Sequence, residues 1–77
     1  MSWKEENDKL QRDFEFENFV EAFSFLTKVA LVAEKANHHP EIFNVYNKVT
    51  LSLSTHDDGN KVTEKDRDLA AKIDELY

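Results

Sequence analysis

The fold is decided by residues 18–36, which read NFVEAFSFLTKVALVAEKA. Apolar residues recur here at spacings of four and three, which lays a stripe along one side of a helix: Phe19, Phe23, Leu26, Ala30 and Ala33. Asn18 is placed to cap this helix, with Glu21 three residues later as in a capping box. Five more apolar side chains widen the stripe: Val20, Phe25, Val29, Leu31 and Val32. The sequence therefore predicts a helix with either a very wide core face or a subunit interface.

The segments on both sides of this helix alternate like half-buried strands. Residues 10–16 place four side chains on one face: Leu10, Arg12, Phe14 and Phe16. Residues 49–54 alternate aliphatic and hydroxyl side chains and form the clearest strand pattern. The apolar run 42–46 predicts a further short strand, followed by a turn at Asn47 and Lys48. Residues 3–8 predict an edge strand or a turn anchored by Trp3.

Arg12 interrupts the apolar face of its strand, and two interpretations stay open. Its stem can snorkel along the edge of the sheet and leave the charge in water. The alternative is a charge that serves a subunit contact or the rim of a pocket.

The last third of the chain predicts a loop and a second helix. Residues 57–60 read DDGN and contain the only glycine of the chain. Thr63 and Asp66 then open a helix in capping-box style, and its apolar face consists of Leu69, Ala70, Ile73 and Leu76. The resulting order is strand, strand, helix, strand, strand, helix. This order predicts an α+β, two-layer fold with helices packed on one face of a four-stranded antiparallel sheet.

Length and composition bound the class of protein. The 77 residues correspond to one domain, and a chain this short buries a small core. It contains no cysteine, so self-association is the expected source of extra stability. The formal charge of -6 argues against direct binding of nucleic acid and against an anionic membrane surface. No membrane span or signal peptide is evident, which predicts a cytoplasmic protein.

Three histidines carry the chemistry that the sequence offers. His38 and His39 are adjacent, and His56 ends a strand-like run. Neighbouring histidines in a loop can face one cavity from two angles, and imidazole exchanges protons near neutral pH. Glu34 lies four positions before His38, so its carboxylate is expected to hold His38 in the protonated form. The alternative for each histidine is a surface or helix-capping role.

A metal site and the role of Asp66 need separate comparison. Three histidines and an acid can hold zinc, but the His-His-Pro spacing suits zinc poorly and no cysteine supports it. We therefore expect no metal. Asp66 has two compatible roles, as the third residue of a helical capping box or as an acid that hydrogen-bonds a histidine at the rim of a pocket.

The spacing of these residues resembles the signature of the pterin-4a-carbinolamine dehydratase family, from about Trp3 to the C-terminus. The matching positions are Glu34, His38-His39-Pro40, Tyr46, His56 and Asp66. The segments FNVYNKV at 43–49 and LSTH at 53–56 are similar to the same family. The resemblance implies loss of water from a 4a-hydroxytetrahydropterin to give a quinonoid dihydropterin. It also implies a homodimer or homotetramer and the absence of any metal or organic cofactor.

The resemblance assigns His38, His39 and His56 to the active site, with Glu34 and Asp66 in support. We expect His38 to act as the acid, His56 as the base and His39 to position the pterin, although acid and base can be exchanged. The alternative function is a non-catalytic binding or dimerisation module for a protein partner.

The chain departs from the family pattern at four places. We expect it to lack the extra N-terminal helix of many relatives. Ile42 stands where several relatives carry tryptophan, and Asn60 stands where a second glycine is common. The loop between His56 and Asp66 is one residue longer than in some members.

Overall fold

Four strands and two α-helices follow one another in the order ββαββα in the computed structural model, which describes residues 3–77. The strands are β1 (Lys4–Glu6), β2 (Lys9–Glu15), β3 (Glu41–Val45) and β4 (Lys48–Leu53). The helices are α1 (Phe19–Ala36) and α2 (Glu64–Leu76), and a single 3₁₀ turn, η1 (His56–Asp58), precedes α2.

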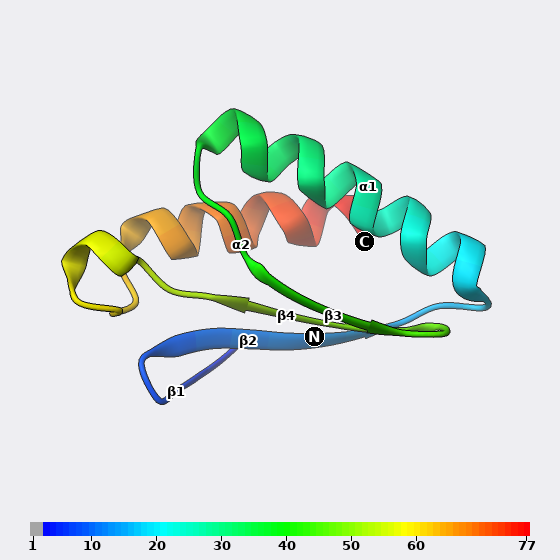
Figure 1. The fold of residues 1–77 in the computed structure, drawn as a ribbon, viewed down its shortest axis with the longest axis horizontal. Helices are drawn as coiled ribbons and strands as arrows, with labels where there is room; N and C mark the ends of the chain where they lie inside the picture. Colours follow the sequence, from blue (N-terminus) through cyan, green and yellow to red (C-terminus); the bar gives the residue numbers. More distant parts are fainter. Residues whose placement is uncertain (1–2) are drawn as a thin grey trace.

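The strands form one antiparallel sheet in the order β1-β2-β4-β3. Both helices lie on the same face of this sheet, which leaves the other face uncovered (Figure 1). The predicted α+β two-layer fold is therefore confirmed. β2 and β4 form the centre of the sheet, with Leu10 opposite Leu53 and Phe14 opposite Val49.

The turn between β3 and β4 lies one residue earlier than the sequence predicted. β3 ends at Val45, and the turn consists of Tyr46 and Asn47 rather than Asn47 and Lys48. The Asn44 amide donates to the carbonyl oxygen of Lys48 at 2.8 Å and closes the hairpin. The Asn47 amide donates to the Phe16 carbonyl oxygen at 2.9 Å, which fixes the turn against the end of β2.

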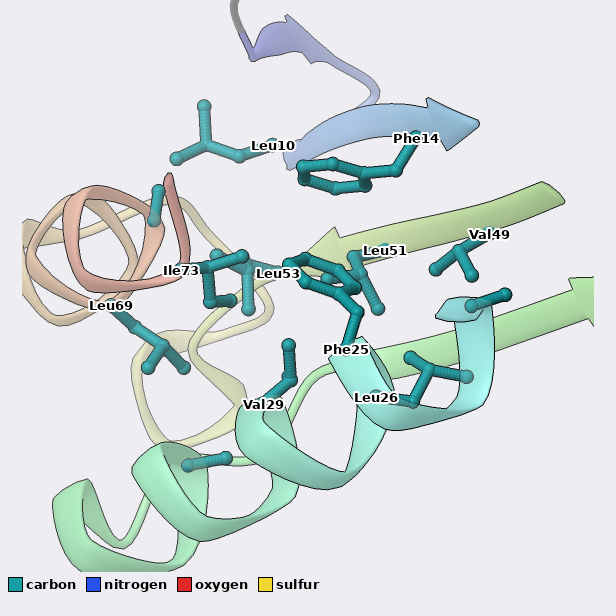
Figure 2. Close-up of a cluster of buried hydrophobic side chains, with 13 residues drawn as sticks. Leu10, Phe14, Phe25, Leu26, Val29, Val49, Leu51, Leu53, Leu69 and Ile73 are labelled. Atoms are coloured by element: carbon teal, nitrogen blue, oxygen red, sulfur yellow. The ribbon is translucent and has the colours of Figure 1, made fainter. Parts of the chain in front are cut away.

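The core lies between the sheet and the two helices (Figure 2). From α1 it takes Ala22, Phe25, Leu26, Val29 and Ala33. The predicted stripe was wrong in part, because Phe19, Phe23 and Ala30 are exposed. The buried and exposed sets share nearly the same helical period, so spacing alone does not choose between them. The face of α1 that packs against the sheet is the one that carries Phe25. The Phe25 ring contacts the Phe14 ring on β2, with 4.9 Å between the ring centroids.

Because α1 buries a different face from the one predicted, different side chains are free to contact a partner. Phe25 and Val29 lie in the core and Val32 is half-buried, so they are not the excess apolar surface. The large apolar residues of α1 that are exposed are instead Phe19, Val20, Phe23 and Leu31. Self-association stays a prediction, with this different surface.

Arg12 does not snorkel at the edge of the sheet, and it is among the residues that line a cavity beside β1 and β2, while a subunit contact stays a prediction. It lies on β2, inside the sheet, and its side chain is 9% exposed. The guanidinium donates to the Asp74 carboxylate at 2.6 Å and lies 4.5 Å from the centre of the Phe14 ring. Arg12 thus joins the sheet to the C-terminal part of α2.

No helix within residues 3–77 is both long enough and apolar enough to cross a membrane.

Replacing Asn18 by alanine is expected to destabilise the domain by about 1 kcal/mol. The Asn18 side chain accepts a hydrogen bond from the backbone N–H of Glu21 at 2.9 Å, which satisfies one of the free donors at the start of α1. Urea unfolding of the wild type and the variant measures the difference. Asn18→Ser keeps a capping oxygen and should recover most of the loss, whereas equal losses in both variants would contradict the capping role.

Candidate active site

The three histidines lie at one end of the fold, where α1 ends and β4 leads into η1. In Figure 1 this is the left side, where the end of α1, the η1 turn and the start of α2 meet. The three histidines line one cavity of about 320 Å³, and its other lining residues are Asn37, Ser54, Thr55, Asp57 and Lys65. The topology thus brings His56 to the His38-His39 pair. Ile42 is not among the residues that line this cavity.

The backbone of the histidine pair is fixed by the way α1 ends. Asn37 adopts the left-handed conformation, with φ 53°, directly after Ala36. Its N–H donates to the Glu34 carbonyl oxygen, and the N–H of His38 donates to the Ala33 carbonyl oxygen, both at 3.1 Å. These two bonds form a Schellman ending, which satisfies carbonyl groups of the last turn. His38 therefore starts from a defined backbone position rather than from a loose loop.

Asp66 is the buried acid of the site. Its carboxylate is fully buried and accepts three hydrogen bonds: from His38 Nε2 at 2.5 Å, from Thr55 Oγ1 at 2.8 Å and from the Thr63 backbone N–H at 2.9 Å. Burial alone raises the pKa of Asp66, but these bonds and the attraction to His38 outweigh it, so the pKa lies below its ordinary value of 3.8. Both roles considered for Asp66 are present, because the same carboxylate closes the capping box of α2 and holds His38.

The sequence predicted that Glu34 pairs with His38, and this prediction was wrong. Its carboxylate accepts a hydrogen bond from His39 Nε2 at 2.9 Å, and both side chains of this pair are more than half exposed. The spacing of four residues brings side chains together only within a continuous helix. Because the helix ends before Asn37, His39 folds back over its last turn and His38 turns inward to Asp66.

His56 is exposed and is the first residue of η1. Its Nδ1 lies 2.6 Å from the side-chain oxygen of Asn60, four residues further along the same loop. From the sequence, Asn60 was predicted to lie in a loop and was noted as a departure from the family pattern, and its contact with His56 was missed.

Thr55 was also missed, although it left a signal in the sequence. Thr55 donates its hydroxyl hydrogen to Asp66, and its oxygen lies 2.6 Å from the Thr63 hydroxyl. Thr55 continues the period of Leu51 and Leu53, so it is a polar residue on the face that packs inward. A hydroxyl at such a position indicates a buried partner.

Among the side chains that the structure describes, those of residues 3–77 except Asp58, no three His, Cys, Asp or Glu are grouped so that they could hold a metal ion. The expected lack of a metal stays a prediction. The arrangement that is present is suited to proton transfer, with a histidine on a buried carboxylate, a histidine on a neutral amide and a third on an exposed carboxylate.

Comparison with known proteins gives one consistent result. Residues 1–76 match the family model described as pterin 4 alpha carbinolamine dehydratase. A curated relative from Solibacter usitatus is 53% identical over 75 residues, which are 97% of this chain and 78% of that protein. One from Sinorhizobium fredii is 58% identical over 71 residues, 92% of this chain and 67% of that protein. Both carry the name "Putative pterin-4-alpha-carbinolamine dehydratase".

Two solved structures share the fold. A transcriptional coactivator/pterin dehydratase from Brucella melitensis is 42% identical with a TM-score of 0.91, over 97% of this chain and 81% of that chain. A pterin dehydratase-like protein, described as a RuBisCO assembly factor in the alpha-carboxysome, is 28% identical with a TM-score of 0.83. That match covers 99% of this chain and 89% of the other.

Proposed function

This chain belongs to the pterin 4 alpha carbinolamine dehydratase family, and from that premise we propose that it removes water from a 4a-hydroxytetrahydropterin. The product is a quinonoid dihydropterin, the form that is recycled after aromatic amino-acid hydroxylation. The observation that carries the proposal is the single cavity lined by His38, His39 and His56, the histidines of the family motif.

The reaction needs one acid and one base. The C4a–O bond breaks, and the leaving hydroxyl takes up a proton to become water. The proton on N5 is lost, and its bonding electrons form the double bond between N5 and C4a. Imidazole side chains perform both transfers near neutral pH, so no metal or organic cofactor is required.

The partners of the histidines support a division of roles. His38 donates from Nε2 to the ionised Asp66, and a carboxylate in this position stabilises a positive charge on the ring. We assign His38 the role of acid, with Asp66 in the supporting part that the sequence analysis gave to Glu34. His56 contacts an uncharged amide and no carboxylate, and we assign it the role of base.

His39 is exposed, contacts an exposed carboxylate and is assigned to positioning the pterin. Replacing Glu34 by glutamine is therefore expected to change little. Exposed ion pairs contribute about 0–1 kcal/mol, so the free energy of unfolding should fall by no more than about 0.5 kcal/mol. The value of kcat should stay within about twofold of wild type, with any effect in KM. Steady-state kinetics checks this prediction. A large fall in kcat would show that Glu34, and not Asp66 alone, supports the catalytic acid.

A dehydration assay tests the proposed function directly. Purified protein is mixed with a freshly generated 4a-hydroxytetrahydropterin, without added metal or cofactor, and formation of the quinonoid product is followed by absorbance. The proposal expects a rate well above that of buffer and proportional to protein concentration. A rate no higher than buffer, from protein whose fold is verified by circular dichroism, would refute it.

A second candidate function is a non-catalytic binding or dimerisation module for a protein partner. The likeness to a pterin dehydratase-like protein described as a RuBisCO assembly factor favours it. The two functions separate in one comparison, because substitution of the histidines abolishes dehydration but leaves an interaction surface on α1 or β3 intact.

We also propose that the chain forms a homodimer or homotetramer. Exposed apolar side chains support this on α1, as described above, and on the β3 hairpin, namely Ile42, Phe43, Val45 and Tyr46. β3 is an edge strand with unpaired backbone groups, and such edges pair readily with other chains. Light scattering at micromolar concentration should give a multiple of the 9.0 kDa chain mass. A strict monomer would contradict the proposal.

A further inference from the structure

The contact between His56 and Asn60 fixes where the hydrogen of the neutral imidazole lies. The side-chain oxygen of an amide only accepts hydrogen bonds, so the Nδ1 atom that lies 2.6 Å from it must be the donor. The second ring nitrogen, Nε2, then carries a free lone pair. A neutral histidine free in water favours the opposite form, with the hydrogen on Nε2.

The loop is built to hold Asn60 in this position. The N–H of Thr55 donates to the Lys61 carbonyl oxygen at 2.8 Å, and the N–H of Asn60 donates to the Thr55 carbonyl oxygen at 3.0 Å. Gly59 and Asn60 both adopt the left-handed conformation, with φ 77° and φ 60°, which turns the chain back toward His56. Asparagine tolerates this conformation better than most residues. A glycine would also meet the backbone requirement but would supply no oxygen.

His56 differs from the other two histidines in the nitrogen that its partner occupies. His38 and His39 both direct Nε2 to a carboxylate, at 2.5 Å and 2.9 Å. His56 instead engages Nδ1, and its partner carries no charge. A neutral acceptor orients a ring and stabilises a positive charge on it much less than a carboxylate does, which suits a base that must start without the proton it takes.

We propose that Asn60 is a positioning residue that selects the Nδ1–H tautomer of His56 and leaves Nε2 as the atom that accepts the proton from the substrate. The second half of this statement rests on the proposed dehydratase function. In the reaction Nε2 takes the N5 proton of the pterin, and the bonding pair stays on the pterin to form the new double bond.

The test measures the tautomer and the kinetics separately. Protein labelled with ¹⁵N is studied by two-bond proton–nitrogen correlation NMR at a pH where His56 is neutral. In wild type, Nδ1 of His56 should give the pyrrole-type signal and Nε2 the pyridine-type signal. In Asn60→Gly, which suits the left-handed backbone, the two should exchange in most molecules.

The same variants are then assayed for dehydration. Asn60→Gly should lose about threefold to tenfold in kcat, which corresponds to one uncharged hydrogen bond, with KM little changed. Asn60→Asp keeps an oxygen and should keep the wild-type tautomer. Lys61→Ala, which removes an exposed side chain from the same loop, should change neither the tautomer nor kcat.

Two results would overturn the proposal. The first is a pyrrole-type Nε2 in wild type, and the second is an unchanged His56 tautomer in Asn60→Gly. Because the NMR signal does not depend on turnover, failure of the proposed function is recognised separately. If the tautomer exchanges in Asn60→Gly but the wild type has no dehydratase activity, the positioning role of Asn60 is supported and only the proposed dehydratase function is contradicted.

Discussion

Replacing His56 by alanine is expected to lower kcat by about 10²–10⁴-fold, the usual contribution of a general acid or base. The fold should survive, because the ring is exposed and its side-chain hydrogen bond goes to Asn60 on the surface loop. The free energy of unfolding should therefore stay within about 0.5 kcal/mol of wild type. Steady-state kinetics and urea unfolding measure the two quantities on the same preparation.

The other two histidines provide matched comparisons. His39→Ala removes an exposed ring paired with an exposed carboxylate, and should mainly raise KM. His38→Ala should lose as much turnover as His56→Ala and should also lose stability, because it removes a hydrogen-bond donor from the buried Asp66. Near-normal turnover in both His38→Ala and His56→Ala would show that the proton transfers are assigned to the wrong residues.

The order of elements was predictable because each element carries a local signal. Alternation at residues 10–16 and 49–54 predicted the two central strands, and both form in the structure. Asn18 and Thr63 predicted the starts of the two helices, and each acts as an N-cap. Such signals depend on neighbours in sequence, so they are visible without the fold.

The buried face of α1 was not predictable in the same way. Phe19 and Phe23 are as apolar as Phe25, so the choice depends on which ring meets Phe14 across the fold. The partner of Arg12 was missed for the same reason, since Asp74 lies 62 residues further along the chain. Contacts of this kind are set by tertiary packing, which overrides local pattern.

The candidate site divides along the same line. The motif indicated the three histidines and Asp66, but it did not indicate which acid meets which histidine. That pairing depends on the helix ending at Ala36, one residue before the left-handed Asn37. Asn37, with Pro40 three residues further along, is itself a signal for a helix end. The separation of Glu34 from His38 could therefore have been anticipated.

Replacing Asp66 by asparagine is expected to lower kcat by about 10²-fold, at the lower end of the contribution of a general acid, because His38 loses the carboxylate that orients it and stabilises its charge. Stability should fall by about 1–2 kcal/mol, because charge-assisted bonds become neutral ones. Asp68→Asn removes an exposed carboxylate from the same helix and should change neither quantity appreciably. An unchanged rate in Asp66→Asn would remove Asp66 from the site.

The stability difference between wild type and Asp66→Asn should also depend on pH in a fixed direction. The pKa of Asp66 is lowered in the folded protein relative to its ordinary value of 3.8, so folding favours the ionised form. The stabilisation is fully present above this ordinary value and is lost as the pH falls through the lower folded-state pKa. Urea unfolding of both proteins between roughly pH 7 and pH 3 should therefore show a constant difference that narrows only in acid. A difference that widens in acid would mean that Asp66 folds in its protonated form, and His38 would then lack the charged partner on which its role as the acid depends.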